Sequence, residues 1–136
     1  MTLRPTAKTK SHFEITIHRE AQFAELVFNG AVDSAVLNNA FVRLVEHPQF
    51  RQNLNALYDY SDAHPDVEMQ EIEEYAQFVA SLSQRRGANY KLALVADDTL
   101  NTALLNVYKL LIAKTTVDAE VFSQRSRAMG WLSSDE

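Results

Sequence analysis

Apolar and polar residues alternate along two short segments near the start of the chain. In residues 12–18 the odd-numbered positions are apolar and the even-numbered positions are polar. Residues 22–28 repeat this period of two, which is typical of a half-buried strand. Because a short link separates the two segments, we predict an antiparallel hairpin, and Asn29-Gly30 predicts a turn after it.

From Asp33 onwards the apolar residues follow a helical period. Asp33 or Ser34 can accept hydrogen bonds from the free backbone amides at the start of a helix, and the apolar stripe that follows has helical spacing. Pro48 disfavours helical geometry at the residue before it, so we predict that the helix ends near Glu46. Residues 54–60 predict a third strand.

Helices and strands alternate over the rest of the chain. The predicted helices are 66–86, 98–114 and 124–132, and the predicted strands are 91–96 and 120–123. Residues 91–96 form the most hydrophobic of the predicted strands. We predict that this strand lies at the centre of the sheet, because buried parallel strands lose their alternation.

The predicted order is therefore β-β-α-β-α-β-α-β-α. Helices between strands imply crossover connections and a mainly parallel sheet, with the opening hairpin as an antiparallel N-terminal edge. A chain of 136 residues, 46% of them hydrophobic, is typical of one globular domain. We predict a single α/β domain over residues 12–132, a flexible basic tail over 1–11 and a C-terminal tail over 133–136.

Composition disfavours several classes of function. The chain has no cysteine, which rules out a disulfide framework, a thiolate zinc site and a thiol nucleophile. Its net charge of -5 disfavours binding to nucleic acids. We see no export signal, and no apolar run reaches the roughly 18 residues of a membrane span. We expect a cytoplasmic protein, for which peripheral contact with a membrane stays open.

Several local patterns match those of a known family. They are strand and helix-cap patterns, and none of them is a catalytic signature. The matching pieces are 47–50 (HPQF), 57–63 (LYDYSDA), 92–96 (LALVA), Val121-Phe122, Ala128 and Trp131-Leu132. Together with the element order, they resemble the STAS domains, and more closely the SpoIIAA-like (STAS/SEC14-like) group of uncharacterised bacterial proteins.

The resemblance implies a STAS-like fold and a noncatalytic, regulatory module. Such a module binds a protein partner or a small apolar ligand such as a lipid. In antagonist STAS proteins a phosphorylatable serine starts the helix after the third strand. Ser61 is the nearest residue in this sequence, but the Asp-Ser-Ser-Gly-like motif around it is absent.

Polar residues follow two predicted strands, at the edge where ligands bind in an open parallel sheet. This strand-end cluster consists of Asp59, Ser61, Asp62, Asp97 and Asp98. Carboxylates are the hard oxygen ligands that divalent cations prefer, which would suit a small metal-dependent enzyme. The alternative is that Asp97 and Asp98 cap the next helix, where its dipole stabilises negative charge. We favour the caps and expect neither a metal site nor a cofactor.

The sequence contains no recognisable catalytic pattern. The histidines lack metal-ligand spacing, and neither a glycine-rich phosphate loop nor a glycine-flanked serine elbow is present. We therefore assign no catalytic residue and treat an enzyme as the less favoured interpretation.

The predicted helix 98–114 is apolar on nearly all sides, which is typical of a helix buried on two faces. Its predicted core stripe is Leu100, Ala103, Leu104, Val107, Tyr108 and Leu111. We predict a groove between this helix and the preceding one, for an apolar ligand or a protein partner. The predicted groove residues are Met69, Phe78, Leu105, Tyr108 and Ile112. Ordinary core packing and a homodimer face are the alternatives.

Overall fold

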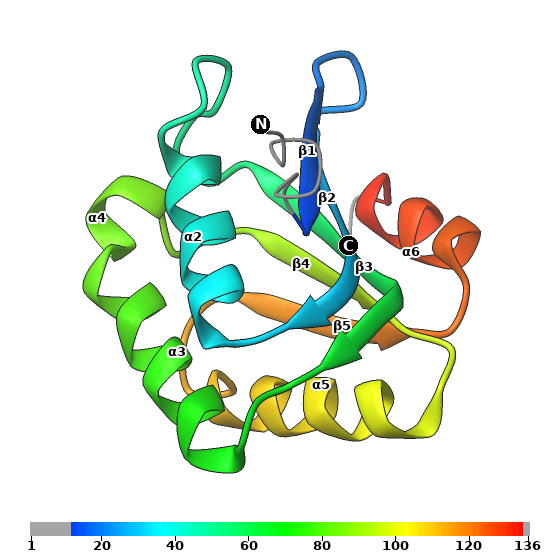
Figure 1. Cartoon of the computed structure of the whole chain (residues 1–136). Coiled ribbons are helices and arrows are strands. Elements are labelled where there is room, and N and C mark those ends of the chain that lie inside the picture. Colours follow the sequence, from blue (N-terminus) through cyan, green and yellow to red (C-terminus); the bar gives the residue numbers. More distant parts are fainter. Residues whose placement is uncertain (1–11, 135–136) are drawn as a thin grey trace, which may run out of the picture.

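The strands lie side by side in the order in which they occur in the chain, β1-β2-β3-β4-β5. Figure 1 shows this arrangement in the computed structural model, which describes residues 12–134. The predicted tail 1–11 and the last two residues of the predicted C-terminal tail lie outside the described residues. The strands are β1 (Phe13–His18), β2 (Phe23–Val32), β3 (Asn55–Pro65), β4 (Lys91–Val95) and β5 (Asp118–Phe122). The helices are α2 (Ser34–Val45), α3 (Met69–Ser81), α4 (Ser83–Arg86), α5 (Thr99–Leu111) and α6 (Arg125–Leu132).

The sheet has the mixed character that the sequence predicts. β1 and β2 pair antiparallel, and every other pair of neighbouring strands is parallel. The α/β class with an antiparallel N-terminal edge is therefore confirmed. The central position predicted for 91–96 is wrong, because strands added in chain order place β3 in the middle and β4 next to it.

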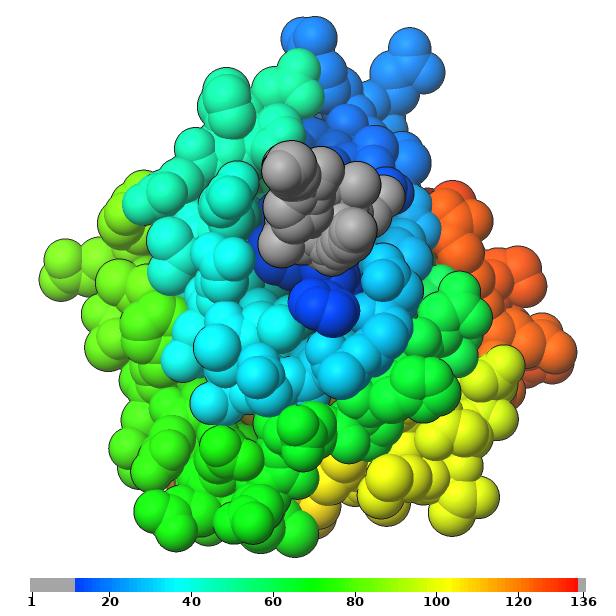
Figure 2. Space-filling model, viewed as in Figure 1, coloured from blue at the N-terminus to red at the C-terminus, as the bar shows by residue number. Residues whose placement is uncertain are grey.

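Helices α2, α3 and α5 cover one face of the sheet, and α6 lies on the other (Figure 1). Each of the first three belongs to a crossover between parallel strands, and crossovers of one hand place their helices on one side. In the space-filling view the cyan, green and yellow atoms of this part of the chain adjoin along the left and lower sides of the molecule (Figure 2). Because successive strand residues point to opposite faces, Tyr58 and Leu94 join the larger core below these helices, whereas Leu57 and Ala93 join a smaller core below α6.

Strands β2 and β3 both run further than predicted. The turn expected at Asn29-Gly30 is wrong, because β2 passes through it with a bulge between Val27 and Asn29. Gly30 has a φ of 69°, a left-handed conformation that glycine adopts without a steric penalty. The extension of β2 gives the end of β3 a partner, and the two strands stay paired as far as Val32 and Pro65.

The predicted helix 66–86 is two helices. α3 begins after Glu68, whose side chain forms a capping box with Glu71 and satisfies free backbone amides of the first turn. The backbone leaves helical geometry at Leu82, and α4 follows as a single turn. It ends at Gly87, the C-terminal stop that the sequence predicts, where φ is 89°.

Gly87 provides a test of this packing. A Cβ atom at this position would lie 2.6 Å from the backbone nitrogen of Asn53, which donates a hydrogen bond to the carbonyl oxygen of Arg86. We expect Gly87→Ala to lower the free energy of unfolding by about 1–3 kcal/mol, from the strained φ and the clash together. Urea unfolding followed by circular dichroism measures the change.

Gly130→Ala is the matched control, because a Cβ atom there has no neighbour within 4 Å and Gly130 lies inside α6. It should raise the free energy of unfolding by about 0.5–1 kcal/mol, the usual gain for alanine over glycine in a helix. Equal unfolding midpoints for Gly87→Ala and the wild type would contradict the packing described for Gly87.

Candidate ligand-binding site

Five buried tyrosines gather between the sheet and the helices α3 and α5. They are Tyr58, Tyr60, Tyr75, Tyr90 and Tyr108. Tyr58 and Tyr60 share one face of β3 because they are two residues apart, and the rings of Tyr75 and Tyr108 lie 5.5 Å apart across the two helices. Burial raises the pKa of Tyr60, Tyr75 and Tyr108 well above the ordinary 10.0, so these hydroxyls stay neutral.

Tyr108 is a common wall of three neighbouring cavities. The α3–α5 cavity has a volume of about 330 Å³, and its apolar walls include Val79, Tyr90, Tyr108, Ile112 and Val117. The tyrosine cavity is smaller, about 20 Å³, and all five tyrosines line it. It shares Val79, Tyr90 and Tyr108 with the α3–α5 cavity, so the two adjoin.

The third cavity lies nearer the start of α5. It has a volume of about 60 Å³, and Tyr60, Leu104, Leu105 and Tyr108 contribute to its walls. The three cavities therefore follow α5 along much of its length, with Tyr108 where they meet.

Arg86 is buried beside the tyrosines, with 1% of its surface exposed. Its guanidinium carbon lies 3.5 Å from the centre of the Tyr90 ring and 5.4 Å from that of Phe50. None of its three side-chain nitrogens has a hydrogen-bond partner among the described residues. Stacking on aromatic rings compensates part of the cost of burying a guanidinium, but it leaves the N–H groups unpaired.

The charge of Arg86 acts on the same tyrosines. Burial raises the pKa of Tyr58 and Tyr90 above 10.0, and the nearby positive guanidinium opposes this shift at both hydroxyls. No pattern in the sequence selects Arg86 as a site residue, because an arginine in the last turn of a helix is usually solvated and stabilised by the helix dipole. Its burial depends on Phe50 and Tyr90, which come from two other segments of the chain.

The predicted groove residues fall into two groups. Leu105, Tyr108 and Ile112 are buried and line these cavities. Phe78 instead packs edge-on against Phe41 of α2, with ring centres 6.0 Å apart, and Met69 is 53% exposed. The structure therefore brings three of the five together.

The core stripe predicted for α5 is correct in part. Tyr108 is buried and Leu104 and Val107 pack against the core, but the helix is rotated so that Leu100, Ala103 and Leu111 are exposed. Leu100 and Leu111 are 57% and 38% exposed, whereas Leu105 and Ile112 are buried. The cause is Asn101, which is buried against β3 and donates a hydrogen bond from Nδ2 to the carbonyl oxygen of Ala63 at 3.0 Å. With a polar residue on its inner face, α5 turns Leu100 and Leu111 away from the sheet.

The predicted strand-end cluster does not come together as a metal site. Asp59, Ser61 and Asp62 lie within β3 rather than beyond its end. Asp98 caps α5 and accepts a hydrogen bond from the backbone nitrogen of Asn101 at 2.9 Å, while Asp97 is exposed. Within residues 12–134, no three carboxylate or imidazole side chains are placed to hold a metal ion.

Ser61 also does not occupy the place of the phosphorylatable serine of antagonist STAS proteins. It is exposed in β3, and its backbone nitrogen donates to Asp59 Oδ1 at 2.9 Å. The helix that follows begins after Glu68, seven positions further along the chain.

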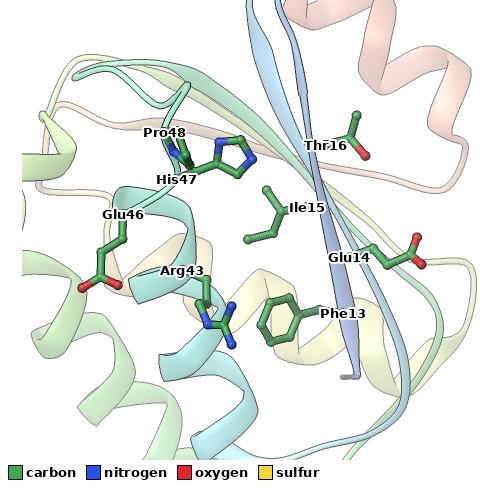
Figure 3. A pocket seen from close by; sticks show the side chains of 8 residues that line it. All are labelled: Phe13, Glu14, Ile15, Thr16, Arg43, Glu46, His47 and Pro48. Carbon is green, nitrogen blue, oxygen red and sulfur yellow. The ribbon is translucent and has the colours of Figure 1, made fainter. Parts of the chain in front are cut away.

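A larger hollow lies elsewhere, between β1 and the end of α2, with a volume of about 670 Å³. In Figure 3, Phe13 and Ile15 point towards α2, whereas Glu14 and Thr16 point away from it. The rest of the lining is Arg43, Glu46, His47 and Pro48. Most of these side chains are polar or charged, so a small apolar ligand would bury little apolar surface there.

The fold has a relative of known structure. A protein from Shewanella loihica PV-4, described as an uncharacterised member of the DUF3478 family with a SpoIIAA-like fold, superposes with a TM-score of 0.58. The match covers 97% of this chain and 98% of that one at 14% sequence identity. The chain therefore has a SpoIIAA-like α/β fold.

Sequence comparisons add nothing to this assignment, because no protein-family model and no curated protein matches the chain. None of the helices within 12–134 is both long enough and apolar enough to cross a membrane.

An ion pair between the buried Glu25 of β2 and the exposed Arg125 connects α6 to the face of the sheet that α6 covers. Glu25 of β2 accepts hydrogen bonds from Arg125 Nε at 2.6 Å and Nη2 at 2.8 Å, and His18 Nε2 lies 2.8 Å from Glu25 Oε1. Arg125 lowers the pKa of Glu25 below the ordinary 4.5, against the effect of burial, and His18 adds to the lowering. Glu25 is therefore ionised at neutral pH and pairs α6 with β2.

The lowered pKa of Glu25 predicts a pH-dependent stability. A carboxyl group with a lowered pKa in the folded state stabilises the fold above its unfolded pKa and loses that contribution as the pH falls through the folded pKa. We expect Glu25→Gln to reduce the free energy of unfolding at pH 7 by about 1–3 kcal/mol. The deficit relative to the wild type should shrink as the pH is lowered below 4.5.

Urea unfolding at a series of pH values measures this difference. Glu20→Gln is the control, because Glu20 is exposed in the turn between β1 and β2 and should change stability little at any pH. A deficit for Glu25→Gln that stays constant from pH 7 to pH 3 would show that the charge of Glu25 does not contribute.

Proposed function

We propose that the protein is a noncatalytic binding module that holds a small apolar ligand in the α3–α5 cavity. The observation that carries this proposal is the cavity itself, whose volume of about 330 Å³ is enclosed mainly by apolar side chains. This volume lies at the lower end of the range of small-molecule sites, which are typically concave, mostly apolar and largely preformed.

The position of the cavity supports the same function. It lies between α3 and the segment that follows α5, and Figure 1 shows this segment passing beside α3 on its way to β5. Ser83, Lys114, Thr115 and Thr116 are among its polar lining residues, and Lys114, Thr115 and Thr116 are exposed. A ligand could therefore bury an apolar part against Tyr108 and Ile112 and leave a polar part near solvent.

The lining also favours binding over catalysis. The described residues around the α3–α5 cavity include no carboxylate, imidazole or thiol side chain. The hydroxyl groups there have no carboxylate or imidazole beside them to act as the general base that activates a hydroxyl nucleophile, and Lys114 is exposed to solvent, where an amine stays protonated.

Filling the cavity tests the proposal. Ala76 of α3 lines it, so we expect Ala76→Phe to occupy part of the space and weaken ligand binding at least about tenfold, the cost of losing a buried apolar contact. The probe is the neutral fluorophore N-phenyl-1-naphthylamine, whose emission rises in an apolar site. The wild type should bind it saturably with one molecule per chain.

Ala103→Phe is the matched control, since Ala103 lies on the exposed side of α5. It should bind the probe as the wild type does. Absence of saturable binding to the wild type, or equal binding by wild type and Ala76→Phe, would contradict the proposed site.

A second candidate function is contact with a protein through the outer face of α5. Leu110 is 75% exposed, and Leu100 and Leu111 share one side of the helix and are also exposed. Exposed apolar patches of this kind occur at protein interfaces, and a second copy of the chain is the simplest partner.

Native mass spectrometry reports the subunit number directly and tests the second candidate. If the outer face of α5 forms a homodimer, we expect a dimer for the wild type and a monomer for Leu110→Ser. The substitution should leave the free energy of unfolding of the monomer nearly unchanged, because Leu110 is exposed. A wild-type monomer at micromolar concentration would contradict a stable homodimer.

A further inference from the structure

We infer that the ligand of this site is an anionic amphiphile, with a negatively charged head of a few atoms placed beside Arg86 and an apolar tail in the α3–α5 cavity. The inference rests on the proposed function, because it names the chemical class of the ligand in the same site. It starts from the one charged side chain that is fully buried next to the tyrosines.

Arg86 is positively charged even though it is buried. A buried lysine or carboxyl group can lose its charge through a pKa shift, but a guanidinium stays protonated at any pH that proteins tolerate. Its Nε, Nη1 and Nη2 are buried and have no partner among residues 12–134. A buried cation without a hydrogen-bonded counter-charge is unfavourable, and an anion that accepts these N–H groups would compensate it.

We place this anion in the tyrosine cavity. Arg86 is not itself among the residues that line the cavity, and the Tyr90 ring on which it stacks is the wall next to it. Arg86 stacks on Tyr90, and Tyr90 lines both the tyrosine cavity and the α3–α5 cavity. The positive charge also acts on the hydroxyls of Tyr58 and Tyr108, which line the tyrosine cavity as well. Neutral tyrosine hydroxyls can donate hydrogen bonds to an anion.

The sizes of the two cavities suggest the orientation of the ligand. The tyrosine cavity, at about 20 Å³, exceeds the space for one water molecule but has no room for a chain of carbon atoms. The adjoining α3–α5 cavity, at about 330 Å³, has that room and an apolar lining. A compact head such as a carboxylate would therefore point inward and the tail outward.

The charge of the surroundings agrees with an anion. The described residues that line the two cavities include no acidic side chain, and Lys114 at the outer end of the larger one adds a second positive charge. Lys114 follows the end of α5, where the helix dipole favours a cation in any case. Arg86 and Lys114 can thus be separated by experiment.

The test compares three probes of equal chain length, octanoate, octanol and octylamine, by their displacement of N-phenyl-1-naphthylamine at pH 7.5. Hydrophobic burial alone would favour octanol, because a carboxylate is more strongly hydrated than a hydroxyl. We expect octanoate to displace the fluorophore at a concentration about tenfold or more below that of octanol, and octylamine to be the weakest.

Variants identify the residue responsible for this preference. Arg86→Met replaces a buried charge by an apolar side chain, a change that proteins often tolerate without loss of stability. We expect it to abolish the preference for octanoate while the affinity for octanol changes less than about twofold. Arg86→Lys should retain part of the preference, and Lys114→Met should retain most of it.

The outcomes separate the two proposals. If the fluorophore binds the wild type but octanoate and octanol displace it equally, the inference of an anionic head group is wrong, while the proposed apolar binding site is retained. If the preference for octanoate survives in Arg86→Met and disappears in Lys114→Met, the head lies at the outer end and the placement beside Arg86 is wrong. If the fluorophore does not bind, both proposals fail.

Discussion

Asn101 determines which side of α5 faces the sheet. Its side chain is buried, donates one hydrogen bond to the carbonyl oxygen of Ala63 at 3.0 Å, and donates another to Asp98 Oδ1 at 2.9 Å. A buried amide needs such partners, because an unpaired one would cost more free energy than an apolar contact returns. Once Asn101 is fixed against β3, the helical period places Leu105, Tyr108 and Ile112 on the inner side as well.

The site follows from this rotation and from the order of the strands. Strands added one after another, with crossovers of one hand, place α2, α3 and α5 on the same face of the sheet. Three helices on one face pack over large aromatic residues of β3 and leave small spaces between rings. The other face has α6 alone, which packs on the smaller apolar core and is also joined to β2 by the Glu25–Arg125 pair.

Periodicity predicted the elements well because each one depends on its own residues. The Asp33 cap of α2, the stop at Gly87 and the hairpin of β1 and β2 are local features, and all three are confirmed. The turn at Asn29-Gly30 was mispredicted because the paired end of β3, more than thirty residues away, keeps β2 extended.

The site was harder to predict for the same reason. The apolar stripe through Leu100 and Leu111 is the more regular one in the sequence, yet with Asn101 bonded to Ala63 these two leucines are turned outward. The burial of Arg86 depends on Phe50 and Tyr90, and no pattern within its own helix indicates that these rings enclose it. Contacts between distant segments decide both features, and periodicity within one segment contains no information about them.

The buried guanidinium of Arg86 is not what stability alone would favour at this position. A core that served stability alone would gain from an apolar residue at position 86, because aromatic rings pack against methionine without the cost of desolvating a charge. In natural proteins, residues that conflict with the requirements of the fold occur mainly at functional sites. Arg86 is a residue of this kind. It stacks on Tyr90, and the Tyr90 ring lines both the tyrosine cavity and the α3–α5 cavity. In the proposed site, Arg86 would place a fixed positive charge next to an otherwise apolar cavity and so provide a means of selecting a ligand by its charge.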